Sequence, residues 1–309
     1  MKRESLIRIR PTLCLMLASL MFLFACKKEP ESEFEPAPEG AIDGLFTVNN
    51  QGDKVYFSQG NLQYQASTNI WRFAGHQWDY MGDDNQNMSS SYDGWMDLFR
   101  WGTSGYDHGA INYQPWSASQ DYYGYNAYGI DYFHLWEQTG RADWGYNCIS
   151  NGGNVENQWR TLTGGENGEW DYVLNLRKTK SEIRYAKAIV NDVNGVILVP
   201  DNLDNSYTFN SANTAWAKYN SNVISQDKWK DLECKGCVFL PAAGSIISHT
   251  NLVTSDGISG RYWSSSSYSI GDGFAYYMYF GDVELDAKGI TDRWCGRSVR
   301  LVHDARLVQ

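Results

Sequence analysis

Apolar residues alternate with other side chains between Phe274 and Leu285, and this pattern constrains the fold more than any other stretch of the chain. The apolar positions are Tyr276, Met278, Phe280, Val283 and Leu285. The dipeptide Gly281-Asp282 interrupts them, so the two-residue period predicts a β-hairpin with a short glycine turn and one buried face. We expect Tyr277 and Tyr279 to lie on the other, exposed face.

The exposed face and its flanking loops combine aromatic, charged and small polar residues, which suits recognition rather than catalysis. The residues expected to bind a ligand are Ser269, Gly271, Asp272, Tyr277, Tyr279, Asp282, Lys288, Asp292, Arg293, Trp294 and Arg297. Aromatic rings would supply rigid contact area, and the Asp and Arg side chains would add charge selectivity. The alternative for each residue is a solvated loop side chain.

The N-terminus has the features of a signal peptide covering residues 1–25. Basic residues at Lys2, Arg3, Arg8 and Arg10 precede an apolar run, residues 13–25, that is too short to cross a bilayer as a stable helix. The run ends directly before Cys26, and this junction resembles a bacterial lipobox. We therefore expect cleavage before Cys26 and lipid attachment to it; an ordinary secretory signal is the alternative.

Residues 26–41 are rich in proline and glutamate, which predicts a disordered tether between the lipid and a single domain at 42–309. Acidic residues after a lipidated cysteine also resemble the export signals of Bacteroides-like lipoproteins, which implies anchoring in the outer membrane and exposure at the cell surface. Without residues 1–26 the chain holds 22 basic and 35 acidic side chains, a formal charge of −13. Such a charge argues against a nucleic-acid partner.

Aromatic residues make up 15% of the chain and lie mostly among Gly, Asn, Ser and Asp, which predicts an α+β fold that is rich in loops, with short antiparallel strands and about two helices. Strands are expected at 46–48, 54–65 with a turn or bulge at 59–61, 71–73, 194–200 and 238–241. Helices are expected at 166–177 and 225–234. Ordered loops held by Trp95, Phe99, Trp101 and Trp116 are expected at 83–143.

Neither a metal nor a cofactor is expected. Four cysteines remain in the domain, Cys148, Cys234, Cys237 and Cys295. Disulfides are possible in an exported protein, but small buried thiols are favoured, notably for Cys148 and Cys237. The Cys234/Cys237 pair lacks a second pair at zinc spacing, and no stretch has the ligand spacing of a calcium loop.

Two sets of motifs resemble known families. Trp159-Arg160-Thr161 and Glu169-Trp170-Asp171-Tyr172 are similar to a motif of formylglycine-generating-enzyme-like domains, which implies a C-type-lectin-like fold. The chain departs from that motif at Thr161-Leu162 and in the added residues 164–168. Further segments resemble surface lipoproteins of gut Bacteroides relatives that are related to the Fibrobacter succinogenes major domain: YFSQGNLQYQAS, WRFAGHQWDYMG, ADWGYN, SNGGN, VFLPAAG, YWSSS and SVRLV.

The resemblance implies a binding protein and not an enzyme. Formylglycine-generating enzymes use two late cysteines, and this chain has only Cys295 there. Some lipoproteins of the resembled group have a last segment that a diversity-generating retroelement rewrites, and the outward residues here are of the types that such rewriting produces. We therefore expect a surface lipoprotein that binds a protein or other surface ligand through its C-terminal segment. Glycan binding and a structural or adhesive envelope role are the alternatives.

Overall fold

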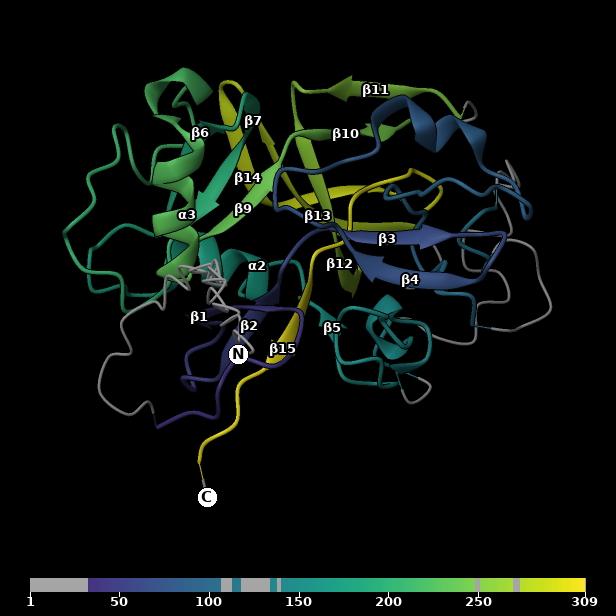
Figure 1. Ribbon diagram of the computed structural model, residues 1–309, viewed down its shortest axis with the longest axis horizontal. Coiled ribbons are helices and arrows are strands. Elements are labelled where there is room, and N and C mark those ends of the chain that lie inside the picture. Colours follow the sequence, from purple (N-terminus) through teal and green to yellow (C-terminus); the bar gives the residue numbers. More distant parts are fainter. Residues whose placement is uncertain are drawn as a thin grey trace, which may run out of the picture. The chain divides into compact units, whose positions relative to one another are not determined.

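The computed structural model describes residues 33–106, 113–117, 134–137, 140–247, 251–268 and 273–308, all within one compact unit, Glu31–Gln309. The predicted signal peptide, Cys26 and three expected ligand contacts, Ser269, Gly271 and Asp272, lie outside these ranges. The fold is α+β, with many short strands and a few short helices (Figure 1). Within the described ranges, no helix has the length and hydropathy needed to span a bilayer.

Short strands account for most of the regular structure. They are β1 Ala41–Thr47, β2 Lys54–Ser58, β3 Leu62–Gln65, β4 Ile70–Phe73, β5 Arg160–Thr161, β6 Tyr185–Val190, β7 Val193–Leu198, β8 Val223–Ile224, β9 Val238–Pro241, β10 Ala243–Ile246, β11 Val253–Asp256, β12 Gly260–Ser267, β13 Phe274–Gly281, β14 Glu284–Asp292 and β15 Leu301–Asp304. The helices are α2 Glu169–Asp171, which continues as a π-helical turn at Tyr172–Leu176, and α3 Gln226–Cys234. Single 3-10 segments occur at Gly82–Asn87, Trp144–Tyr146 and Tyr219–Ser221.

The strands form separate small sheets. Their orders are β1-β2-β15-β5, β11-β10-β12-β13-β14, β8-β6-β7-β9 and β3-β4. The last strand, β15, pairs antiparallel with β2 near the start of the domain. The ends of the domain are therefore joined within one sheet, and the segments between them supply the other sheets.

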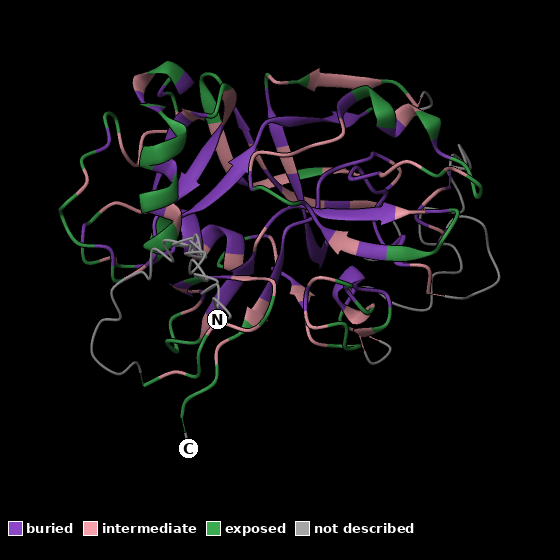
Figure 2. Ribbon diagram, in the orientation of Figure 1, coloured by how far each residue is buried: buried purple, intermediate pink, exposed green. Residues whose placement is uncertain are grey.

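The sheet that contains β12 and β13 has a core cluster on each side. Tyr262 and Met278 belong to one cluster of buried residues, whereas Trp263, next to Tyr262, and Ala275, three residues before Met278, belong to the other. Adjacent residues of a strand point to opposite faces. The burial colouring in Figure 2 agrees, because β12 is almost entirely buried.

Local signals predicted helix α3 correctly. The Ser225 hydroxyl accepts a hydrogen bond from the Lys228 N–H as the N-cap, and Gly236 follows the helix with φ +85°. The expected helix at 166–177 is shorter than predicted. Gly165 and Asn167 have φ values of +91° and +56°, which α-helix excludes, so the helix starts at Glu169. Its predicted inward residues, Trp170, Val173, Leu174 and Arg177, are all buried.

The end of the predicted tether differs from expectation, because residues 33–40 are ordered. The Glu35 N–H donates to the Arg306 carbonyl, and the Tyr56 hydroxyl donates to the Glu35 carbonyl. Phe34 also forms a bridge with Leu307. The chain therefore joins the domain before β1, through hydrogen bonds to its own C-terminal tail.

Candidate functional site

The predicted hairpin consists of β13 and β14, and its turn residues are Asp282 and Val283, between the paired Gly281 and Glu284. Met278 and Phe280 are fully buried, as expected. Val283 was expected in the core, and this was wrong: it is 63% exposed. The turn lies one residue later than the sequence suggested, so Val283 occupies the tip of the hairpin instead of a strand position.

Arg261, Tyr279 and Asp286 form a row across three strands. Tyr279 pairs with Arg261 of β12 on one side and with Asp286 of β14 on the other, so the three side chains share one face of the sheet. The Arg261 guanidinium lies 5.0 Å from the centre of the Tyr279 ring and donates to the Ser259 hydroxyl at 2.8 Å. Tyr279 is half-buried in this row, between two hydrogen-bonded neighbouring strands.

Tyr277 lies in the next row, opposite Trp263 and Gly289, and is held from several sides. The Arg297 guanidinium carbon is 4.0 Å from the centre of its ring, and the Trp263 ring packs edge-on at 6.3 Å. A side chain on Gly289 would meet the Tyr277 ring at 2.8 Å, so the ring fits because position 289 is glycine. The phenolic oxygens of Tyr277 and Tyr279 make no hydrogen bond with the described part of the chain.

Arg293 and Arg297 were expected to face a ligand, and this was wrong for both. They are only 1% and 4% exposed. Arg293 lies 4.3 Å from the centre of the Trp101 ring, and Arg297 also lies 5.3 Å from that of Trp263. Because a guanidinium plane stacks well on aromatic rings, these cations are packed inside the domain. Burial lowers the pKa of Arg297 to about 10.

The other expected contacts are more accessible. Asp282 is exposed, and Lys288, Asp292 and Trp294 are partly exposed. The Lys288 ammonium lies 4.0 Å from a Glu166 carboxylate oxygen, and Trp294 packs against the core cluster that contains Trp263. The structure thus brings Tyr277, Tyr279 and Asp282 together on one hairpin.

Two residues of this surface, Arg261 and Asp286, were missed from the sequence. Both are directly opposite Tyr279 in the sheet. Pairing the YWSSS strand with the hairpin would have indicated them, but the register was not predictable from the strand period alone.

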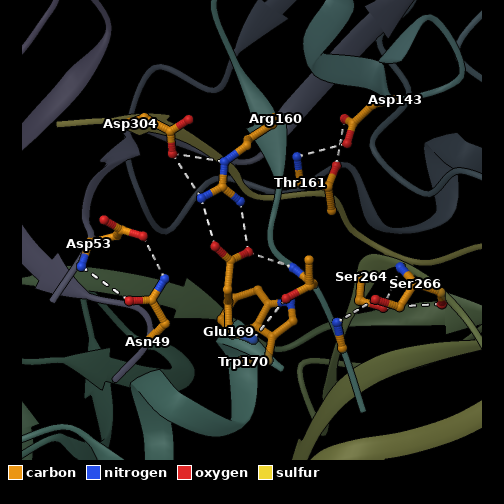
Figure 3. Close-up of polar contacts among 12 residues, drawn as sticks. Asn49, Asp53, Asp143, Arg160, Thr161, Glu169, Trp170, Ser264, Ser266 and Asp304 are labelled. Carbon is orange, nitrogen blue, oxygen red and sulfur yellow. Dashed lines mark hydrogen bonds and ion pairs between the residues drawn. The ribbon is translucent and has the colours of Figure 1, made fainter. Parts of the chain in front are cut away.

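A separate polar site surrounds Arg160 on β5 (Figure 3). Arg160 lines a cavity of about 610 Å³ together with residues from the first and last strands of the domain and their flanks, including Asp53, Asp304 and Leu307. Arg160 binds both Glu169 carboxylate oxygens at 2.7 Å and Asp304 at 2.8 Å. Burial lowers the pKa of Arg160, but the Glu169 and Asp304 carboxylates more than offset this and raise it above its usual value.

The carboxylates near Arg160 have structural partners. Glu169 accepts from the Thr163 N–H at 2.8 Å, and its own N–H donates to the Thr163 hydroxyl at 2.9 Å. Asp143 accepts from the Thr161 N–H and hydroxyl, and burial raises its pKa. The hydrogen bonds of Glu169 hold α2 against β5 and the residues that follow it, and β5 contains Arg160 and Thr161 of the tryptophan-arginine-threonine motif. Both carboxylates are thus engaged in fixing the backbone.

The described cysteines differ in their exposure. Cys237 is buried as expected, and burial raises its pKa to about 12, whereas Cys148 was expected to be buried and is exposed. Cys234, the other member of the pair, is also exposed. Among the residues described, no group of three or more His, Cys, Asp or Glu side chains could hold a metal ion.

The chain matches no protein-family model, no curated protein and no solved structure. The structure therefore has the predicted α+β class, and the C-type-lectin-like fold remains a prediction.

Proposed function

We propose that this protein is a lipid-anchored outer-membrane protein that displays a C-type-lectin-like binding domain at the cell surface. Its ligand surface is the sheet β12-β13-β14, and the ligand is a protein or another surface molecule. Cys26 carries the lipid that anchors the domain, and the domain has no enzymatic activity.

The row Arg261-Tyr279-Asp286 carries this proposal. It places a cation, an aromatic ring with an unpartnered hydroxyl and a carboxylate side by side on three hydrogen-bonded strands. A ring that is already held loses little conformational freedom on binding, which favours affinity. The charged neighbours then distinguish one partner from another.

The hairpin also separates support from recognition. Met278 and Phe280 point into the core, whereas Tyr277 and Tyr279 alternate with them on the other face. Substitution at Tyr279 would therefore change the surface and leave Met278 and Phe280 in place, whereas Tyr277 also packs against the core cluster that contains Trp263. This arrangement supports the hypothesis, implied by the family resemblance, that the C-terminal segment is diversified.

Site-specific photo-crosslinking on living cells tests the proposal. A benzophenone amino acid would replace Tyr279 in the full-length protein, and the matched control would replace Ile70, an exposed residue of β4 outside the surface. We expect light-dependent adducts at position 279 and none at position 70. Equal labelling at both positions, or none at position 279 in the presence of neighbouring cells, would overturn the proposed binding surface.

A further inference from the structure

A buried lysine joins the hairpin turn to a distant loop. The Lys187 ammonium, on β6, donates to the Ala215 carbonyl and to the Gly281 carbonyl, each at 2.6 Å. Ala215 precedes Trp216, and Gly281 precedes the turn residues Asp282 and Val283. One ammonium therefore holds the loop of Trp216 beside the tip of the hairpin.

A third turn joins the same region through Tyr219. The Tyr219 hydroxyl donates to the Ile258 carbonyl at 2.9 Å, and its ring packs edge-on against Phe280 at 6.4 Å. Trp216, Ile258 and Val283 thus project from three neighbouring turns, and we call them the three-turn surface. They are 76%, 62% and 63% exposed, respectively. Large apolar side chains exposed together mark a surface that another molecule covers.

The Trp216 side chain is available for contact. It makes no hydrogen bond and no ring contact within the described ranges. The backbone beneath it is fixed, because the Ala217 N–H donates to the Thr214 carbonyl and Lys187 holds the carbonyl of Ala215. An exposed tryptophan on a fixed turn is the type of residue that contributes most to protein interfaces.

The surface is continuous with the row described above. A side chain added to Gly281 would lie 2.7 Å from the Tyr279 hydroxyl oxygen, so that hydroxyl reaches the start of the hairpin turn. The ligand surface therefore extends from Tyr279 over the hairpin tip to the loop of Trp216.

Acidic side chains surround the three-turn surface. Asp256, Asp282 and Glu284 are exposed within or next to the turns, and Lys218 is the one exposed cation in these turns and the positions next to them. Lys187 is buried beneath the surface. The excess of carboxylates complements a basic partner and opposes an anionic membrane surface.

We infer that the three-turn surface binds a protein segment that combines an apolar pocket or side chain with flanking lysine or arginine residues. This inference rests on the proposed binding function and names the class of partner. Val283 and Ile258 offer no hydrogen bonds to sugar hydroxyls, and a central apolar contact with a charged rim is the usual arrangement of a protein interface.

Panning a random peptide library against the immobilised full-length protein tests the inference. We expect enrichment of peptides that pair aromatic or aliphatic residues with lysine or arginine. The affinity of an enriched synthetic peptide should fall at least about tenfold in Trp216→Ala, since truncating a central tryptophan typically removes that much binding. It should also weaken as salt rises. Val155→Ala, a substitution of an exposed valine outside the three turns, serves as the control and should bind as the wild type does.

Different outcomes of the panning and binding experiments would overturn different parts of the inference. A peptide that binds Trp216→Ala as well as wild type but fails on Tyr279→Ala would overturn the three-turn surface and leave the proposed function standing. Enrichment of acidic or uncharged peptides, or of none, would overturn the basic protein partner. Binding of a glycan or of zwitterionic vesicles that depends on Trp216, without any enriched peptide, would assign the surface to that class instead. Circular dichroism checks that both variants are folded.

Discussion

The guanidinium of Arg297 lies 4.0 Å from the centre of the Tyr277 ring, and the side chain has no carboxylate partner within the described residues. Its Nη2 donates to the Thr291 hydroxyl at 2.9 Å, while Nε and Nη1 are buried without a hydrogen bond. The stacking of this cation on Tyr277 and Trp263 therefore offsets an unfavourable desolvation.

Arg297→Met should for this reason change the free energy of unfolding by less than about 1 kcal/mol, because methionine fills the site and removes the buried charge. Arg297→Ala should cost about 2–4 kcal/mol, since it leaves a cavity beside Tyr277. Urea denaturation of both variants measures this. A methionine variant as unstable as the alanine variant would show that the charge itself is needed.

Gly289→Ala should destabilise the hairpin by about 1–3 kcal/mol, because the added carbon would overlap the Tyr277 ring. In a Tyr277→Ala background the same substitution should cost almost nothing, so a double-mutant cycle isolates the contact. Gly75→Ala is the control, since its nearest atom, the Asp79 Oδ2, lies at 3.6 Å. Equal costs with and without the Tyr277 ring would contradict this contact.

Lys187 should make stability rise with pH in the alkaline range. Burial lowers the pKa of its ammonium from 10.5 to about 8, and the facing Asp282 and Glu284 carboxylates oppose this only in part. Between these two pH values the unfolded chain binds more protons than the folded chain, so the free energy of unfolding increases with pH. Below pH 8 both states are protonated and the contribution is constant.

The comparison of wild type with Lys187→Met isolates this effect, because both chains share the Tyr219 ring and every other titrating group. From pH 7.5 to pH 9.5 the unfolding free energy of wild type should gain about 2 kcal/mol relative to the variant. Urea denaturation at both pH values measures the difference. A constant or shrinking difference would mean that Lys187 is not destabilised by burial.

Glu169 and Asp304 both bind Arg160 but should differ in their effect on stability. The Glu169 side chain is mostly buried, so Glu169→Ala leaves a desolvated cation and should cost about 3 kcal/mol. Asp304 is 65% exposed, and Asp304→Ala should cost less than about 1 kcal/mol. Thermal and urea unfolding compare the two. Similar costs would indicate that Arg160 is held through the exposed pair instead.

The parts of the fold that depend on local patterns were predictable from the sequence. The alternation around Met278 indicated the hairpin, and Ser225 with Gly236 marked the limits of α3. The turn was misplaced by one residue because glycine can occupy the last strand position as readily as the turn. The exposure of Val283 followed from that shift.

The parts that depend on distant segments were not predictable. Arg297 and Arg293 resemble surface residues until Trp263 and Trp101 are known to cover them. Trp216 lies in a loop without periodicity, and its position beside the hairpin comes from Lys187, 28 residues before Ala215. A single hydrogen-bonded lysine thus creates a surface that no sequence period indicates.

The anchor prediction rests on residues outside the described ranges and has its own test. Cys26→Ser removes the thiol that would carry the lipid, so the full-length protein should move from the membrane fraction to the soluble fraction. Cys148→Ser is the matched control, because Cys148 is an exposed thiol of the domain and should not affect fractionation. Because Glu35 is already hydrogen-bonded to the domain, fewer than ten residues separate it from Cys26, where the lipid is proposed, and these residues could span at most about 30 Å. Membrane association that persists in Cys26→Ser would contradict the lipid anchor and this close tethering.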